Sequence, residues 1–178
     1  GQLRLAEKTS GGWAIEAVPT ATSTSSPDMV VDSRGRPWLG HTRGSDRDVW
    51  VSWRDGTIWR HEAPRGVEST IYPSLAIDAA DVLHLAATRA DPVHHAVRTG
   101  ANMWTVEDIS SGGADVGMAL DGSGLPIFAY ERFGFLSTSC YVAWWTPADY
   151  DGHALGGCGH RNGRKAAIAA TGSTYVAI

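Results

Sequence analysis

A repeated pattern of about 45 residues constrains what this chain can fold into more than any other feature of its sequence. Each repeat has a short apolar run, a turn beginning with aspartate and a second apolar run. The turn positions are Asp32, Asp78, Asp121 and, in the fourth repeat, Ala169. The steps between them are 46, 43 and 48 residues. Such a period indicates an array of similar units, each of one supersecondary element.

A second marker keeps the same period. Tryptophan followed three residues later by glutamate occurs at Trp13, Trp59 and Trp104, with steps of 46 and 45 residues. Two unrelated markers on one period make a chance repeat implausible. The tryptophan is expected on the fourth strand of each unit, packed between neighbouring sheets.

Each unit divides into four short runs of strand-forming residues separated by Gly, Pro and Asp. In the first full unit the strands are predicted at about 28–32, 36–42, 48–53 and 57–63. Four strands in about 45 residues are typical of a β-propeller blade. A β-sandwich is the rival fold, but it would not require a strict two-marker period. We therefore predict an all-β protein, a β-propeller of four-stranded blades with about four repeats.

The chain is predicted to form one domain over 1–178. Its repeats cover roughly 1–18 plus 165–178, 28–63, 73–109 and 116–160. By their position in the repeat, residues 1–18 correspond to the third and fourth strands of a blade, and residues 165–178 correspond to the first and second strands. Two arrangements follow: the terminal halves join as one split blade, or the chain is a segment of a larger propeller. In the second case, further repeats from another chain or self-association would complete the fold.

Composition excludes several classes of protein. Apolar residues make up 43% of the chain and charged residues 19%, which is typical of a folded domain. The formal net charge is −4, and a duplex-binding domain is usually basic, so nucleic acid is not an expected partner. No apolar run approaches the ~20 residues of a membrane helix, so no membrane span is expected.

The half-blade around each turn aspartate, followed by the tryptophan–glutamate strand, resembles the extracellular propeller repeats of sialidase-like and lectin-like proteins. These repeats are called Asp-box or BNR repeats. In the strict box glycine follows aspartate by two residues, whereas Gly35 follows Asp32 by three. NHL-type propeller repeats share a similar turn and compete with this assignment. The resemblance implies a secreted or periplasmic propeller that binds a glycan or an anionic ligand.

Arginines occupy one phase of the repeat. Arg43, Arg89 and Arg132 each follow the turn aspartate by eleven residues. Equivalent loops of a propeller gather on one face, so three guanidiniums there could bind a carboxylate or sulfate. In sialidases, an arginine triad binds the sugar carboxylate. Alternatively, each arginine is a duplicated structural residue that pairs with a neighbouring blade.

Aromatic side chains are the other candidate ligand contacts, because a sugar ring stacks on an indole. Trp38, Trp53 and Tyr130 are the predicted contacts, and the recurrent fourth-strand tryptophan does not account for them. Trp50, Trp144 and Trp145 share this property, and packing between blades is the alternative role for the whole group.

The sequence carries weaker indications of catalysis. A sialidase-like site needs a tyrosine–glutamate pair, but the adjacent Tyr130 and Glu131 point to opposite faces of an extended strand. Asp46, Asp48 and Asp115 are other carboxylates that could form a glycosidase pair, and their spacing cannot be read from the sequence. No catalytic residue and no cofactor is therefore predicted. Two alternatives stay open: a sialidase-like glycoside hydrolase, and a protein-binding scaffold without a small-molecule site.

The two cysteines, Cys140 and Cys158, suggest a disulfide. A hairpin centred near residue 149 places them opposite each other, and the bond would close a loop worth roughly 3 kcal/mol. With His153 and His160 the same cysteines could form a zinc set, but their spacing matches no common zinc motif. We predict the disulfide and no metal site, which also favours an oxidising compartment.

Overall fold

The computed structural model describes residues 1–20, 24–44, 47–67, 70–88, 92–133, 138–146, 149–157, 167–171 and 173–177. Within these residues, sixteen strands form five antiparallel sheets. All sixteen elements of the described residues are strands, and no described helix is long and apolar enough to cross a membrane.

Three of the sheets are four-stranded meanders that follow the chain order. The first full sheet contains β3 (Thr24–Val31), β4 (Pro37–Arg43), β5 (Asp48–Asp55) and β6 (Ile58–Glu62). The second contains β7 (Ile71–Ile77), β8 (Leu83–Thr88), β9 (Val93–Gly100) and β10 (Met103–Ser110). The third contains β11 (Ala114–Leu120), β12 (Pro126–Phe133), β13 (Thr138–Trp145) and β14 (Tyr150–Gly157). The predicted all-β fold of four-stranded propeller blades is confirmed.

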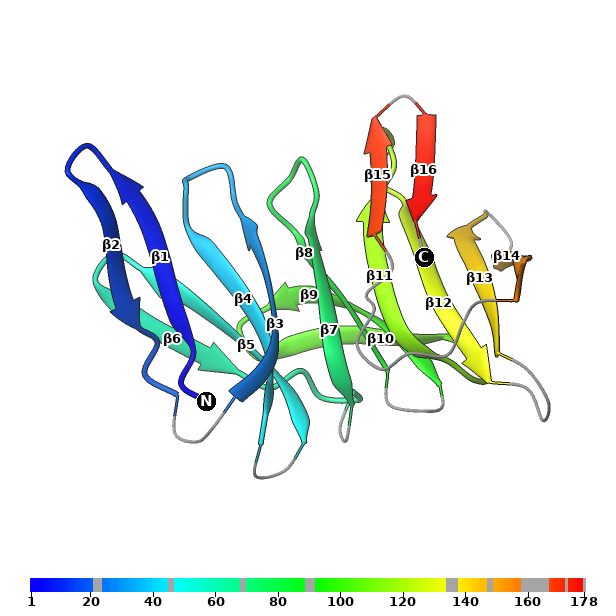
Figure 1. Ribbon diagram of the computed structural model, residues 1–178, viewed down its shortest axis with the longest axis horizontal. Coiled ribbons are helices and arrows are strands. Elements are labelled where there is room, and N and C mark those ends of the chain that lie inside the picture. Colours follow the sequence, from blue (N-terminus) through cyan, green and yellow to red (C-terminus); the bar gives the residue numbers. More distant parts are fainter. Residues whose placement is uncertain are drawn as a thin grey trace.

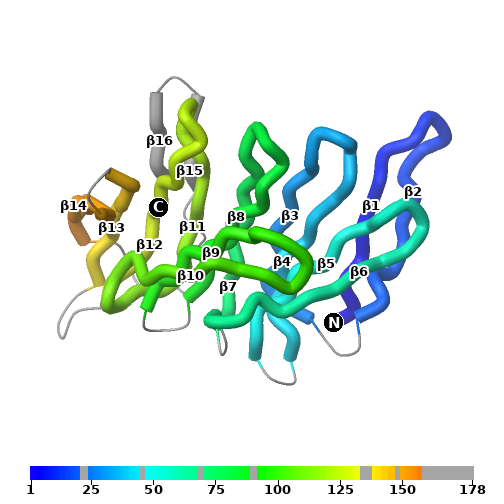
Figure 2. Tube along the Cα trace, turned by 180° about the vertical axis from the view of Figure 1, so that it is seen from behind, coloured from blue at the N-terminus to red at the C-terminus, as the bar shows by residue number. Residues whose placement is uncertain are grey.

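The three sheets stand side by side in a row, with their first strands adjacent (Figures 1 and 2). Side chains at one phase of the repeat join these inner strands. The amide of Leu75 on β7 donates to Asp28 Oδ2 on β3 at 2.7 Å, and the amide of Met118 on β11 donates to Ser74 Oγ on β7 at 3.1 Å. Ala76, on the same inner strand, is 9% exposed.

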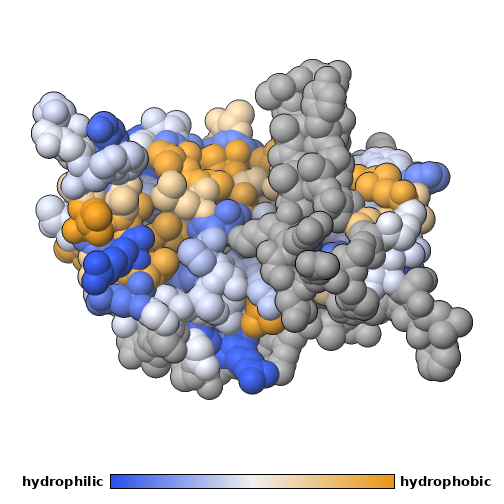
Figure 3. All heavy atoms as spheres, in the orientation of Figure 1, coloured by the Kyte–Doolittle hydropathy of each residue, from blue (hydrophilic) through white to orange (hydrophobic). Residues whose placement is uncertain are grey.

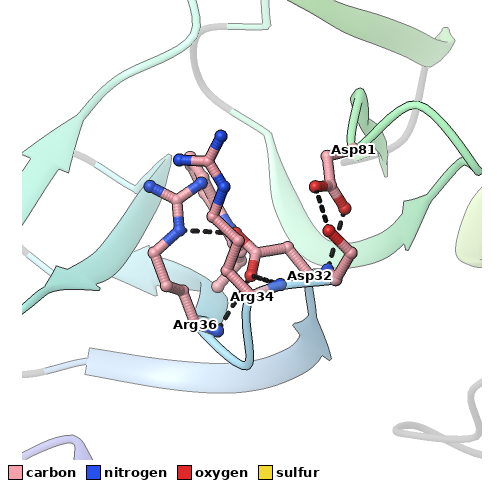
Figure 4. A network of polar contacts seen from close by, with 6 residues as sticks. Asp32, Arg34, Arg36 and Asp81 are labelled. Atoms are coloured by element: carbon pink, nitrogen blue, oxygen red, sulfur yellow. Dashed lines mark hydrogen bonds and ion pairs between the residues drawn. The ribbon is translucent and has the colours of Figure 1, made fainter.

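The turn aspartates have the same local role in all three sheets. Oδ1 of Asp32 accepts the amides of Arg34 and Arg36 at 3.0 and 2.9 Å (Figure 4). Asp78 and Asp121 accept the corresponding pairs of amides at 2.8–2.9 Å. Each carboxylate therefore caps the turn between the first two strands, which is why aspartate marks the period.

The second full sheet differs at the last position of this turn. Gly35 and Gly124 have φ of +76° and +81°, and Asp81 takes the same left-handed conformation at +62°. Aspartate tolerates this conformation better than most residues. In return, the Asp81 carboxylate accepts the amide of Ser33 at 2.8 Å and its hydroxyl at 2.5 Å, joining two neighbouring turns (Figure 4).

A second irregularity repeats near the start of each inner strand. Ser26, Tyr72 and Asp115, spaced by 46 and 43 residues, all have positive φ between +48° and +57°. The strand register shifts at these same points, so each inner strand carries a β-bulge. None of the three residues is glycine, and the sequence analysis did not anticipate the bulge.

The recurrent tryptophans pack between sheets, as expected, where a preceding sheet is present. Trp59 packs against a cluster of Leu3, Leu5 and Val18, and Trp104 packs against the core of the first full sheet. Trp13, on the hairpin that begins the row, is 64% exposed.

The terminal strands form two separate hairpins. β1 (Arg4–Thr9) pairs with β2 (Gly12–Ala17), and β15 (Ala167–Thr171) pairs with β16 (Ser173–Ala177). The β15–β16 hairpin lies beside β11 and β12, away from β1–β2, so the described strands of the two hairpins do not pair as one split blade (Figure 1). Whether further repeats complete the propeller stays a prediction.

The hairpin β15–β16 also departs from the repeat. Ile168 pairs with Val176 and Thr171 with Ser173, so β15 continues past the position where the other units turn. The fourth unit has Ala169 where the others have aspartate, and alanine has no carboxylate to cap a turn there.

The predicted disulfide falls partly outside the described residues. Cys140 on β13 is 4% exposed and pairs with Gly156 on β14, and Ser139 pairs with Gly157. Cys158 follows directly in sequence but lies outside the described residues, so the bond stays a prediction. In protein purified without reductant, we expect an alkylating reagent to label neither cysteine before reduction and both after it. Intact mass measures this directly, and two labels before reduction would contradict the disulfide.

Candidate functional site

The two predicted ligand-contacting tryptophans stack on each other inside the first full sheet. Trp38 on β4 and Trp53 on β5 are cross-strand partners whose rings lie 4.8 Å apart and within 16° of parallel. Trp38 is only 5% exposed, and its indole N–H donates to Asp32 Oδ2 at 3.1 Å. The same oxygen accepts a 2.6 Å hydrogen bond from Arg36 Nε (Figure 4). Asp32 is thereby held in place and in turn orients the indole of Trp38.

A guanidinium from the next sheet covers this indole pair. Arg98 on β9 lies 5.3 Å from the ring centroid of Trp38 and 5.1 Å from that of Trp53. Its charge is paired with Glu62, whose side chain is 1% exposed, at 2.7 Å. The structure thus gives Trp38 and Trp53 packing contacts between blades, and their contact with a ligand stays a prediction.

The two described arginines of the predicted triad each lie over an aromatic ring of their own sheet. The guanidinium of Arg43 lies 4.0 Å from the ring centroid of Trp50, and that of Arg132 lies 5.7 Å from that of Tyr141. Arg132 Nη2 also donates to Ser111 Oγ at 3.4 Å. Arg89 lies outside the described residues, so convergence of the three arginines stays a prediction.

Tyr130 is buried and cannot present its ring to solvent. It is 5% exposed and stacks on Tyr141 with ring centroids 5.8 Å apart. Burial raises the pKa of its phenol above the usual value. The adjacent Glu131 is also 5% exposed and pairs with Cys140 in the ladder, one step from the Tyr130–Tyr141 pair. Neighbouring ladder positions point to opposite faces, so these two side chains do not act on one atom.

A cavity on the third full sheet has the character of a small-ligand site. Its volume is about 420 Å³. The lining residues are Asp121, Leu125, Pro126, Ile127, Val142, Trp144 and Trp145. Val142 and Trp144 share one face of β13, while the ring of Trp145 packs edge-on against Tyr150 with centroids 4.9 Å apart. The lining is therefore mostly apolar, with two indoles and one carboxylate.

The cavity lies at the position of the third full sheet that corresponds to the Trp38–Trp53 pair of the first full sheet. Ile127 pairs with Trp144 as Trp38 pairs with Trp53. The guanidinium of Arg98 lies over the ring of Trp53, whereas the equivalent residue Trp144 lines the cavity. Sequence analysis considered Trp144 but could not choose it, since exposure is not readable from the repeat.

A set of links between sheets was not predicted from the sequence. The repeated glutamate reaches into the next sheet each time: Glu16 binds Arg54 at 2.7 Å, Glu62 binds Arg98, and Glu107 accepts from the Tyr150 hydroxyl at 2.6 Å. The two arginines are 44 residues apart, near the period of the repeat, which is the signal that could have revealed them. They differ in phase from the predicted triad.

Buried histidines form two hydrogen-bonded chains. His84 Nδ1 lies 3.1 Å from His95 Nε2, and His95 Nδ1 lies 2.8 Å from Glu107 Oε1, to which it donates. In the first full sheet, Ser52 Oγ lies 2.8 Å from both His41 Nε2 and His61 Nδ1. Burial, together with the nearby His61 and Arg43, lowers the pKa of His41 to about 4. Burial also lowers the pKa of His61, His84 and His95.

These histidines do not make a metal site. Within the described ranges, no three His, Cys, Asp or Glu side chains are grouped so that they could hold a metal ion. Cys158 and His160, two members of the zinc set considered from the sequence, lie outside those ranges.

No family model and no curated protein matches the chain. Seven solved chains do match in structure. One is described as a fucose lectin from Kordia zhangzhouensis in complex with methyl-fucoside. It is 14% identical, and the match covers 72% of this chain and 97% of that chain with a TM-score of 0.49. The candidate site is therefore interpreted from its own geometry.

Proposed function

We propose that this protein is a carbohydrate-binding propeller, and that the cavity at Trp144 is its binding site. The observation that carries the proposal is that the indole of Trp144 borders a cavity of about 420 Å³. At the equivalent position of the first full sheet, the guanidinium of Arg98 covers the indole of Trp53. Small-molecule sites usually enclose about 300–1,000 Å³, with apolar walls and few polar groups. A sugar ring presents an apolar face to an indole and hydroxyl donors to a carboxylate.

The charge of the cavity favours a neutral sugar over an acidic one. Its described lining residues include the carboxylate of Asp121 and no cation. A sialic acid or sulfated sugar would bring a second negative charge beside Asp121 without a partner for it. Arg43 and Arg132, the two described arginines of the triad predicted to bind an anionic ligand, lie over aromatic rings elsewhere. Oδ1 of Asp121 caps the turn, which holds the carboxylate in place.

The proposal is tested by replacing Trp144 with alanine. We expect the variant to lose at least about tenfold in affinity for any neutral glycoside that the wild type binds, because stacking on an aromatic ring is worth about 1–3 kcal/mol. Titration calorimetry with methyl glycosides of common neutral sugars, methyl-fucoside among them, measures the affinity. Trp13→Ala is the matched control, since that indole is 64% exposed and is not among the described residues that line the cavity at Trp144.

Two results would contradict the proposal. One is wild-type affinity in the Trp144→Ala variant, which would place the sugar elsewhere. The other is binding only of sialylated or sulfated ligands, which would return the site to the arginines. Hydrolysis of a fluorogenic glycoside would instead support the glycosidase alternative. Location in a secreted or periplasmic compartment is part of the same proposal and is expected from the predicted disulfide.

A further inference from the structure

A second cavity lies between the second and third full sheets, at the turns that join β7 to β8 and β11 to β12. Its volume is about 440 Å³, and its described walls include Asp78, Ala79, Asp121, Ser123 and Gly124. We call it the inter-turn cavity. The β7–β8 turn reaches the upper edge of the molecule, where Figure 3 shows weakly apolar surface residues. Ala79 and Ser123 are exposed, so the inter-turn cavity opens to solvent.

The first and second full sheets close the corresponding place with a side-chain bridge. The amide and the hydroxyl of Ser33 donate to the Asp81 carboxylate at 2.8 and 2.5 Å (Figure 4). By position after the turn aspartate, Ala79 corresponds to Ser33 and Gly124 corresponds to Asp81. Alanine has no hydroxyl to donate and glycine has no carboxylate to accept. The second pair of turns therefore leaves a cavity where the first pair is joined.

The carboxylate of Asp121 also differs from its equivalent in the first full sheet. Oδ2 of Asp32 accepts from the indole of Trp38 at 3.1 Å and from an arginine Nε at 2.6 Å. The corresponding side chains after Asp121 are aliphatic, Leu125 and Ile127, and cannot donate. Oδ1 of Asp121 caps its turn, while Oδ2 has no hydrogen-bond partner among the described residues.

At Asp78 the corresponding residue is His84, which presents an acceptor instead of a donor. Burial lowers the pKa of His84 and of His95, which keeps both rings neutral. His95 Nδ1 donates to Glu107, so its Nε2 accepts from His84 Nδ1 at 3.1 Å. The remaining nitrogen, His84 Nε2, is a bare acceptor that is buried, has no described hydrogen-bond partner and faces Asp78 Oδ2 at 3.9 Å. Neither group can donate to the other, so a donor from a ligand would satisfy an acceptor that the chain leaves unused.

We propose that the inter-turn cavity binds a small ligand through a primary ammonium group held by Asp78 and Asp121. The described lining residues include these two carboxylates and no cation, so a positive charge is favoured over a neutral or negative group. An ammonium carries three donors and no acceptor, which matches carboxylate oxygens without donors of their own. Among the described residues, no three His, Cys, Asp or Glu side chains are grouped around a metal position, so an organic cation fits the walls better than a metal ion.

The inter-turn cavity is distinct from the cavity at Trp144. The two share Asp121 alone among their described lining residues. An ionised carboxylate has about four lone-pair sites, so it can accept donors from both sides of its turn. The ammonium site is therefore additional to the proposed sugar site and does not depend on it.

The first test titrates isotope-labelled protein with three probes near pH 6.5, where the amines are protonated, and follows the backbone amide chemical shifts. Glucosamine carries an ammonium on a sugar ring, cadaverine carries ammonium groups without a ring, and N-acetylglucosamine has the ring without the charge. Glucosamine is expected to shift the amides of Ala79, Gly122 and Ser123, and N-acetylglucosamine is not. Shifts with cadaverine as well would show that the ammonium alone is recognised, and their absence would show that the sugar ring is recognised with it. No shift with either amine, or equal binding of N-acetylglucosamine, would overturn the proposal.

The second test removes one charge from the wall. Asp78→Asn keeps an oxygen for the amides of Ala80 and Val82, which Asp78 Oδ1 now accepts at 2.8 Å. It is expected to raise the dissociation constant of the amine at least about tenfold, because hydrogen bonds to charged groups are the strong ones. Asp55→Asn is the matched control, since it removes the same charge from another exposed turn outside the inter-turn cavity. Equal losses in the two variants would overturn the role of Asp78.

The third test closes the inter-turn cavity with the bridge that the first pair of turns uses. The double variant Ala79→Ser, Gly124→Asp copies Ser33 and Asp81. Gly124 has φ of +81° and Asp81 has φ of +62°, and a Cβ at Gly124 would meet no atom within 4 Å, so the backbone accepts the change. Circular dichroism checks that the variant is folded. The amine-induced shifts are expected to disappear, and undiminished amine binding would overturn the location of the site.

Discussion

Replacing Glu62 by alanine is expected to lower the free energy of unfolding by about 3 kcal/mol. Its side chain is 1% exposed and accepts four hydrogen bonds from the next sheet. The donors are Arg98 Nε at 2.7 Å and Nη2 at 3.3 Å, the amide of Asn102 at 3.1 Å and the indole of Trp104 at 3.0 Å. The substitution leaves the Arg98 guanidinium without its counter-charge and two further donors without an acceptor. Urea unfolding monitored by tryptophan fluorescence measures the change.

The same position in the first hairpin supplies the control. Glu16 has the phase of Glu62 and binds Arg54, but its side chain is 42% exposed. Water can replace a carboxylate there, so Glu16→Ala is expected to cost no more than about 1 kcal/mol. Equal losses in the two variants would show that burial between the sheets does not set the strength of the link.

Acid is expected to weaken the fold because His41 must stay neutral in it. Its pKa is about 4 in the folded chain, against an ordinary value of 6.5. Between these pH values the unfolded chain binds a proton that the native chain does not, so stability falls as the pH decreases from about 6.5 to about 4. A difference of 2.5 pKa units corresponds to about 3 kcal/mol. The lowered pKa values of His61, His84 and His95 act in the same direction.

The measurement compares unfolding free energies at pH 7.5 and pH 4.5. His41→Gln can keep a hydrogen bond to Ser52 Oγ but has no proton to gain. The free energy of unfolding of this variant is expected to fall much less between pH 7.5 and pH 4.5 than that of the wild type, whatever its value at pH 7.5. An unchanged decrease in this variant would show that His41 is not responsible for the acid sensitivity.

Local features of the fold were predictable because they depend on the residues that make them. The turn aspartates mark the period because each carboxylate caps its own turn within four residues. The strands of the first full unit were predicted to within a few residues, since the alternation of apolar runs with Gly, Pro and Asp is itself local. The bulges at Ser26, Tyr72 and Asp115 were not predicted, because no glycine marks them.

The candidate site was less predictable, because exposure depends on neighbours that are distant in the sequence. Trp38, Trp53 and Tyr130 were selected as aromatic residues without a repeat role, and contacts made on folding bury or cover each of them. Trp144 has the same character in the sequence and borders a cavity. The difference is that Arg98 covers Trp53, and the repeat does not show where this side chain lies.

By itself, the sequence determined the repeat, the four-stranded unit and the residues that shape each turn, because these follow from periodicity and short-range hydrogen bonds. Only the tertiary structure decided which indoles border a cavity, which glutamate is buried and how far each described inner strand is exposed. Met29 and Leu75 are equivalent in the sequence, yet they are 50% and 5% exposed. The physical reason is that a repeat encodes the same side chains in every unit, whereas burial depends on the unit packed beside it.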